Sequence, residues 1–347
     1  MGNPNFEVDQ RNAGAGVTNA ANASFLQDRW KLSKTGTMTI NATRPAGSVL
    51  VPGTNFNISN YCQTITLTTQ QSSLAVGDYL LFYQVVEGQQ LRELIGDAHS
   101  ISLLVRSTVA GLKFGVGLRD SNPAVTKSLC KLCTLGAANT WTLITLPNLP
   151  VWAAGGNWNV VPGIEGYTIG IALACGTTLT TPANDSWQSG NFVGAVGQDN
   201  FCAKPTNSTF QMAFVQHEPG ADCSTLMDCP FQVNYDDCLR YYYKTYNYTV
   251  AVGTAGVAGN VSVAALGSQS PIAPVSFKKI MAKTPSLSYW DSSNGTANSV
   301  RDSYAALSRT VTGTVGVSEG SAGYPTLSTT NTGQSIYNWH FLADTGW

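Results

Sequence analysis

The chain has 347 residues, and only 11% of them are charged, against about 25% in an ordinary soluble domain. The net charge is −1 and the densest basic pair is Lys278-Lys279, which argues against a nucleic-acid partner. With 43% apolar residues disorder is not expected, and no apolar run reaches the roughly 18 residues of a membrane span. These values describe a neutral globular chain, long enough for two domains at about 150 residues each.

The N-terminal sequence MGNPN has neither a basic nor an apolar stretch, so we expect no signal peptide and synthesis in a cytoplasm. The eight cysteines are then expected to be free thiols. Cys130 and Cys133 form a lone CxxC pair, and only Cys223 and Cys229 come near to a second one. Because structural zinc needs four ligands at suitable spacing, we predict no metal and no cofactor.

The first part of the chain carries short, alternating runs that are rich in β-branched residues and separated by Gly, Pro or Asn. This pattern predicts the strands of an all-β sandwich. The runs are residues 62–69, 79–86, 101–105, 113–118, 141–146, 167–173 and 210–215.

Residues 235–246 (YDDCLRYYYKTY) are the one helical stretch that we predict, because acids stand near its start and bases near its end. Strand-like runs resume at residues 275–280, 286–290, 305–311 and 336–342. We therefore predict four parts. They are an N-terminal arm (1–22), a β-sandwich (23–220), a connector with a short helix (221–248) and a smaller C-terminal β-domain (249–347). The arm is rich in Gly, Ala and Asn and poor in core-forming residues, so we expect it to grip a neighbouring subunit.

A β-protein with so few charges lacks the Lys and Glu that usually protect exposed strand edges from association. We expect other subunits to cover much of its surface, and hence an obligate oligomer.

Several short motifs occur together in a fixed order. They are residues 6–14 (FEVDQRNAG), 28–30 (DRW), 63–71, 85–89, 94–96, 104–107, 139–141, 176–178, 186–188, 215–220 (VQHEPG), 229–231, 238–242 (CLRYY) and 277–285. This order resembles a jelly-roll domain that is common in structural proteins of tailed phages and prophages. The resemblance implies a jelly roll like that of carbohydrate-binding modules, placed on a virion appendage that is often trimeric.

The chain departs from that family pattern at two places. His217 stands where the family has Leu, and residues 99–103 (HSISL) lack the family's Phe-Trp pair.

The sequence shows no convincing arrangement of catalytic residues, so we predict that the protein is not an enzyme. Residues 316–320 (GVSEG) match GxSxG, but a loop follows Ser318 in place of the helix that a nucleophile elbow requires. His99, His217 and His340 are far apart in the sequence and show no paired metal-ligand spacing.

The best candidates for binding are three tryptophans, because aromatic faces stack on sugars and neighbouring amides and acids bind their hydroxyls. Trp152 and Trp158 flank a Gly-bearing turn, and Trp187 lies beside Asp185. We therefore name Trp152, Trp158, Trp187 and Asp185 as glycan-binding candidates. The alternative, which we favour, is that the tryptophans close the ends of the sandwich or lie at a subunit interface.

The leading hypothesis is a non-enzymatic phage virion surface protein, a fibre or spike. We expect a homotrimer that contacts other virion proteins and the glycans of the host surface. One alternative is a capsid-decorating or tail-scaffold protein without a receptor role. Another is a polysaccharide depolymerase or esterase.

Overall fold

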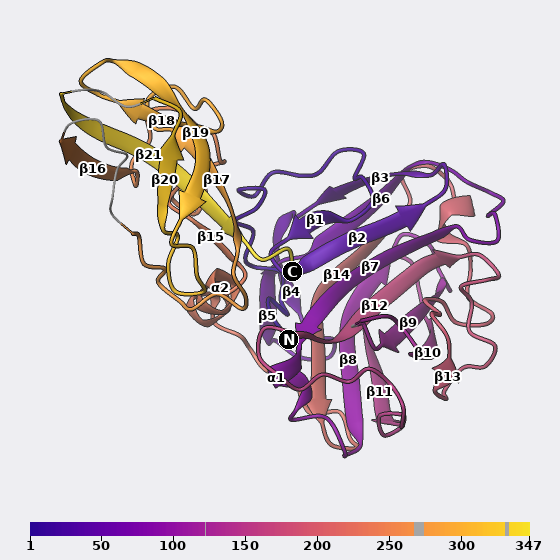
Figure 1. The fold of residues 1–347 in the computed structure, drawn as a ribbon. Coiled ribbons are helices and arrows are strands. Elements are labelled where there is room, and N and C mark those ends of the chain that lie inside the picture. The colour runs from indigo at the N-terminus through magenta and orange to yellow at the C-terminus, as the bar shows by residue number, and fades with distance from the viewer. Residues whose placement is uncertain (122, 267–273, 330–332) are drawn as a thin grey trace. The chain divides into compact units, whose positions relative to one another are not determined.

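The computed structural model describes residues 1–121, 123–266, 274–329 and 333–347 (Figure 1). The chain divides into two compact units, Met1–Asn234 and Tyr235–Trp347, and the division falls within helix α2 (Phe231–Leu239). Nearly all regular structure is antiparallel β, which confirms the all-β prediction. No helix among the described residues is long and apolar enough to cross a bilayer.

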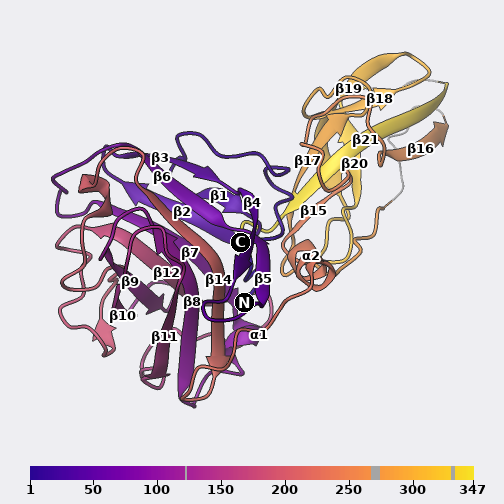
Figure 2. The ribbon, with the colours of Figure 1, turned by 180° about the vertical axis from the view of Figure 1, so that it is seen from behind.

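Two antiparallel sheets form the first unit, and Figure 2 shows them from behind. The seven-stranded sheet has the order β1 (Ser24–Gln27), β2 (Trp30–Thr35), β7 (Tyr79–Glu87), β12 (Glu165–Cys175), β9 (Lys113–Arg119), β10 (Lys127–Thr134) and β13 (Gln188–Ser189). The five-stranded sheet has the order β11 (Thr142–Leu149), β8 (His99–Ser107), β14 (Thr209–Pro219), β6 (Gln63–Thr69) and β3 (Thr39–Thr43). Outside these sheets are the pair β4 (Ala46–Leu50) and β5 (Asn57–Tyr61), helix α1 (Gly88–Leu91) and a 3₁₀ turn (Phe201–Ala203).

The core lies between the two sheets because each strand alternates its side chains. On β7, Leu80 and Phe82 are fully buried in the core, whereas Tyr79 and Tyr83 belong to a smaller apolar cluster on the other face. Leu103 of β8 reaches the same core from the five-stranded sheet. This two-layer packing is the predicted jelly-roll sandwich, and all seven strands expected in this part of the chain are present.

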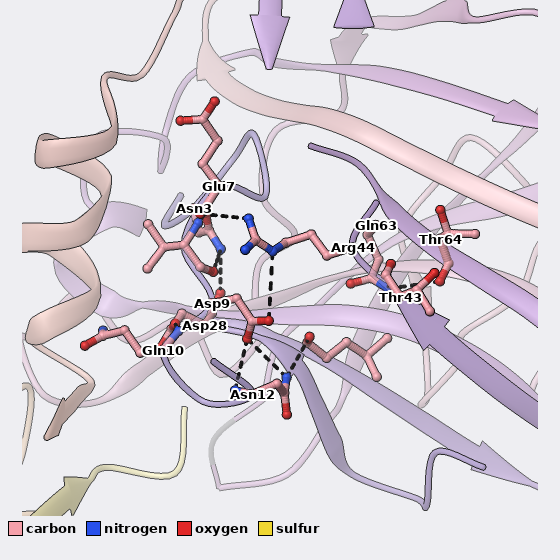
Figure 3. Close-up of polar contacts among 12 residues, drawn as sticks. Asn3, Glu7, Asp9, Gln10, Asn12, Asp28, Thr43, Arg44, Gln63 and Thr64 are labelled. Carbon is pink, nitrogen blue, oxygen red and sulfur yellow. Dashed lines mark hydrogen bonds and ion pairs between the residues drawn. The ribbon is translucent and has the colours of Figure 1, made fainter. Parts of the chain in front are cut away.

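The first residues of the chain belong to the core of this unit. Phe6 is fully buried and its ring lies 5.2 Å from that of Trp30, although we expected the segment to be poor in core-forming residues. A buried polar network fixes the segment (Figure 3): the Arg44 guanidinium is 3.9 Å from the Asp9 carboxylate, which accepts a hydrogen bond from the Asn12 amide. Contact between the predicted arm and a neighbouring subunit stays a prediction.

The second unit is a single sheet wrapped around one long strand, β21 (Gln334–Asp344). Its other strands are β15 (Tyr242–Lys244), β16 (Val261–Leu266), β17 (Ser286–Asp291), β18 (Ser299–Asp302), β19 (Leu307–Val315) and β20 (Tyr324–Leu327). Tyr337, Trp339 and Phe341 of β21 form the centre of its buried cluster.

Two expectations for the second half of the chain are wrong. The helix ends at Leu239 and does not continue to Tyr246, because Tyr242, Tyr243 and Lys244 pair with β21 as β15. Tyrosine suits a pleated sheet, and the Tyr243 ring packs against Phe277 and Phe341. Residues 275–280 form no strand: among the described residues, their β-pairing is limited to an isolated bridge between Ser276 and Ser321.

Candidate functional site

The outer faces of the two sheets in the first unit differ in how they are covered. Outward side chains of the five-stranded sheet, such as Leu104 and Phe214, are buried in a cluster with Val49, Ile58 and Leu226. That cluster contains residues of the β4–β5 pair and of the segment before α2. The outer face of the seven-stranded sheet carries a smaller cluster and, beside it, a hollow of about 180 Å³.

Aromatic, cationic and amide side chains line this hollow on the outer face of the seven-stranded sheet. Its walls and floor are Ser33 of β2, Tyr79, Leu81 and Tyr83 of β7, Arg119 of β9 and Asn191 of the loop after β13. We call this set the outer-face hollow. Tyr79 and Tyr83 are four residues apart on one strand, which places their Cα atoms about 13 Å apart with Leu81 between them.

Small residues on the two central strands let neighbouring groups pack closely around the hollow. Facing Leu81 and Tyr83 across the β7–β12 ladder are Ala172 and Gly170, and a Cβ on Gly170 would lie 2.8 Å from Leu81 Cδ1. On β9, Gly115 lets the loop after β13 approach closely, since a Cβ there would lie 2.9 Å from the main-chain nitrogen of Ala195. Leu81 and this loop therefore cover part of β12 and β9, and the tyrosines of β7 line one side of the hollow.

The polar groups of the hollow are only partly paired. The Tyr79 hydroxyl and the Ser33 hydroxyl are 2.8 Å apart, and the Arg119 guanidinium donates to the side-chain oxygen of Asn191 at 2.8 Å. In the part of the chain that the structure describes, no protein group accepts from the Tyr83 hydroxyl, and no second group accepts from Arg119. These two side chains therefore retain hydrogen-bonding capacity for a ligand.

Burial affects the charges of the hollow. Loss of hydration lowers the pKa of Arg119 from its ordinary value, although the nearby Tyr79 and Tyr83 oppose the shift. Burial also raises the pKa of the Tyr83 phenol, so that this hydroxyl stays a neutral donor at physiological pH. The site thus offers two aromatic rings, neutral hydroxyls and one cation.

The three tryptophans named from the sequence meet at one end of the sandwich. The Trp152 ring centroid lies 4.8 Å from that of Trp158 and 5.5 Å from that of Trp187. Trp152 is buried, and each of the three indole N–H groups donates to a main-chain carbonyl: Leu94 for Trp152, Ala153 for Trp158 and Val151 for Trp187. We call these three residues the tryptophan cluster. Its polar edges are already paired within the protein, and its role in glycan binding stays a prediction.

Asp185, the fourth candidate, points elsewhere. Its exposed carboxylate forms an ion pair with Lys131, and its backbone has φ 66° in a turn. It therefore lies on a surface loop, and within the described residues it forms no hydrogen bond or ion pair with the tryptophan cluster.

Two histidines that are distant in the sequence come together beside the tryptophan cluster. His99 and His217 lie on the neighbouring strands β8 and β14, and their ring nitrogens Nδ1 and Nε2 are 3.0 Å apart. Since His99 Nε2 must donate to the carbonyl of Pro150, its Nδ1 accepts from His217 Nε2, and His217 Nδ1 accepts from the Tyr167 hydroxyl. This is the arrangement of two neutral rings, and burial, which lowers the pKa of His99 to about 4 and also lowers that of His217, keeps both neutral at pH 7. The pair occupies the two places where the chain departs from the family pattern.

The remaining candidates for chemistry are not brought together. Ser318 lies in the turn between β19 and β20, where its hydroxyl accepts from the Gly320 N–H. Cys130 and Cys133 lie on β10; the Cys133 side chain joins the main core, while the Cys130 thiol lies near Gly117 and the carbonyl of Phe192 on the outer face. Burial raises the pKa of both thiols to about 12, so neither is a thiolate at neutral pH.

No protein-family model matches the chain, and no curated protein matches it. Among solved structures, a family 11 carbohydrate-binding module from Clostridium thermocellum in complex with a mixed-linked tetrasaccharide has a TM-score of 0.31 at 10% identity, covering 58% of this chain and 95% of that chain. TmCBM61 in complex with β-1,4-galactotriose has a TM-score of 0.29 at 11% identity, covering 63% and 97%. The enzymatically active domain of tailspike protein 4 of bacteriophage CBA120 has a TM-score of 0.29 at 12% identity, covering 58% and 21%. The likeness concerns the fold, and at these TM-scores it carries no argument about ligand or origin.

The residues of the outer-face hollow were not among the sequence candidates. The sequence does contain one indication of these residues, because Tyr79, Leu81 and Tyr83 occupy alternate positions of a predicted strand. Because the inner positions of the same strand are also apolar, the alternation does not tell the two faces apart. Asn191, which lies on a loop, has no such signal.

Proposed function

We propose that this protein is a non-enzymatic glycan-binding protein that holds a sugar in the outer-face hollow. The observation that carries the proposal is the joint presence of Tyr79, Tyr83, Arg119 and Asn191 around one hollow, whose other lining residues are Ser33 and the apolar Leu81, Leu179 and Val193. Aromatic rings stack on the C–H faces of sugars, while a guanidinium and an amide bind hydroxyls or other polar substituents.

A glycan array with the purified full chain tests this proposal. Wild-type protein should bind a defined group of glycans, and the double variant Tyr79→Ala/Tyr83→Ala should lose at least about fivefold in affinity, because two ring contacts at roughly 0.5–1.5 kcal/mol each amount to at least about 1 kcal/mol. Trp158→Ala is the matched control, since it removes a half-buried aromatic ring outside the hollow. Unchanged binding by the double variant would contradict the proposal.

We also propose the finer role: a fibre or spike protein on the virion surface, homotrimeric, which contacts host-surface glycans and other virion proteins. The resemblance of the ordered sequence motifs to phage structural proteins supports it, as does the low content of protective charges. Light scattering should give three times the chain mass of 36.8 kDa, and a stable monomer would contradict the trimer. Density for the protein on the capsid lattice in purified particles would favour the capsid-decorating alternative.

The absence of enzymatic activity is part of the proposal. Incubation with host capsule or lipopolysaccharide should release no product. Turnover that disappears in Ser318→Ala would instead favour the depolymerase or esterase alternative.

A further inference from the structure

We propose that the sugar held in the outer-face hollow is acidic, a uronic acid or a similar carboxylated sugar, and that Arg119 is the residue that selects it. This inference rests on the proposed glycan-binding function and specifies its ligand class.

First, the guanidinium of Arg119 is not paired with a carboxylate in the part of the protein that the structure describes. Within the described residues it forms no ion pair, whereas two other poorly exposed arginines do: Arg44 with Asp9 at 3.9 Å and Arg309 with Asp302 at 3.0 Å. A poorly hydrated guanidinium without a carboxylate is costly, so a ligand that supplies one gains binding energy.

The nearest acid in the sequence does not fill this role. Asp120 follows Arg119 directly, but it is fully buried, and its carboxylate accepts from the main-chain N–H groups of Thr126, Lys127 and Asn157 at 2.6–2.9 Å. The charge of Glu165, at the start of β12, helps to raise the pKa of the Tyr83 phenol. Among the described residues, Glu165 forms no ion pair with Arg119. Asp120 is near enough to oppose the lowering of the Arg119 pKa, but main-chain N–H groups hold its carboxylate, and neither acid forms an ion pair with the guanidinium in the described part of the chain.

The second step is the geometry of the guanidinium. One Nη1–H is used on Asn191, which fixes the side chain at the wall of the hollow. The remaining N–H groups form the planar fork that binds a carboxylate through two parallel hydrogen bonds. Tyr79, Tyr83 and Arg119 line the same hollow, so one sugar can contact a ring and the guanidinium together.

The third step is size. A volume of about 180 Å³ lies below the roughly 300–1,000 Å³ of sites that enclose drug-sized ligands, and it suits one sugar residue of a longer chain. In such a small site, a single charged contact decides which kind of sugar residue is bound.

Titrations of the isotope-labelled full chain, followed by NMR, test the inference. The probes are trisaccharides of galacturonate, glucuronate and mannuronate, each paired with its methyl ester, together with the neutral glycans that bind on the array. At least one acid should bind at least tenfold more tightly than its ester and shift the signals of Tyr79 and Tyr83. Arg119→Gln should bring the affinities for acid and ester to within twofold of each other, at whatever level the ester then binds, and Arg119→Lys should restore part of the difference.

Lys31→Gln provides the charge-matched control. Lys31 is the cross-strand partner of Tyr83, but its ammonium lies 4.4 Å from the centre of the Phe25 ring. Removing this cation should leave the preference for the acid within twofold of wild type. Thermal unfolding of every variant checks that the fold is kept.

The outcomes separate the two proposals. Equal affinity for acid and ester, binding of neutral glycans alone, or a preference that survives in folded Arg119→Gln would overturn the acidic-sugar inference and leave glycan binding standing. If no glycan shifts the signals of Tyr79 and Tyr83, the proposed function fails together with the inference.

Discussion

Arg119 at the end of β9 and Asn191 in the loop after β13 are joined by a hydrogen bond of 2.8 Å, in which the guanidinium donates to the amide oxygen. This bond places the cation of the outer-face hollow between a rigid strand and a loop. Asn191 is neutral, so it positions Arg119 without cancelling its charge. The choice of an amide over a carboxylate at residue 191 is therefore central to the ligand class that we propose.

We predict that Asn191→Asp removes the preference for acidic sugars. The new carboxylate would sit at hydrogen-bond distance from Arg119 and would take the place of the ligand's carboxylate. Affinity for the preferred uronate should fall at least tenfold in calorimetric titration, while affinity for its methyl ester should stay within about threefold. Asn191→Ala is the control: it removes the hydrogen bond but adds no charge, and it should cost less.

The His99–His217 pair predicts a stability that depends on pH. The unfolded chain takes up a proton on each histidine below pH 6.5, whereas in the folded chain the pKa of His99 is about 4 and that of His217 is also lowered. Stability is therefore complete above pH 6.5 and is lost as the pH falls towards 4. His99 alone should account for a loss on the order of 3 kcal/mol.

Denaturant unfolding at several pH values measures this loss. In His99→Phe/His217→Leu the slope between pH 6.5 and 4 should largely disappear, even though the absolute stability changes because the Tyr167 hydroxyl loses its acceptor. A double variant that keeps the wild-type slope would show that other groups cause it.

The tryptophan cluster is expected to stabilise the fold. Trp152 is buried and stacks with His99 at 4.8 Å, so Trp152→Ala should lower the free energy of unfolding by about 3–5 kcal/mol. Glycan affinity at a temperature where the variant is folded should not change. Trp158→Ala should cost less stability, because that ring is only partly buried. If Trp158→Ala reduces glycan binding and leaves stability unchanged, the tryptophan cluster is the binding site and the outer-face hollow is not.

Removal of residues 1–12 separates the two interpretations of the N-terminal segment. Phe6 is fully buried against the stacked rings of Trp30 and Phe82, and the carbonyl of Asn3 accepts from the Trp30 indole. The truncated chain should therefore lose at least about 3 kcal/mol of unfolding free energy. If the segment serves only as an arm for a neighbouring subunit, truncation should instead lower the assembly mass and leave the stability of each chain unchanged.

The sequence was sufficient for the architecture of the first unit because its strands are long and alternate regularly. It was insufficient where tertiary contacts override local preference. The acids and bases of residues 235–246 favour a helix, but pairing of Tyr242 with Asp344, a residue more than 100 positions away, draws the end of this stretch into a sheet.

For the site, the sequence identified aromatic residues as the relevant chemistry, but it could not show which of them share a surface. Trp152 and Trp187 are 35 positions apart and stack in one cluster. His99 and His217 were set aside because they are far apart in the sequence, yet they form a hydrogen-bonded pair. Arg119 was not a candidate, because the sequence does not show whether an arginine has a carboxylate beside it. Only the three-dimensional structure shows which charged groups surround it.

The most direct test of the central claim is a crystal structure of the full chain with the tightest-binding oligosaccharide from the array. We expect density for a sugar ring in the outer-face hollow, against Tyr79 or Tyr83 and within hydrogen-bond distance of Arg119. Sugar density against Trp158 and Trp187, or elsewhere on the chain with an empty hollow, would contradict it.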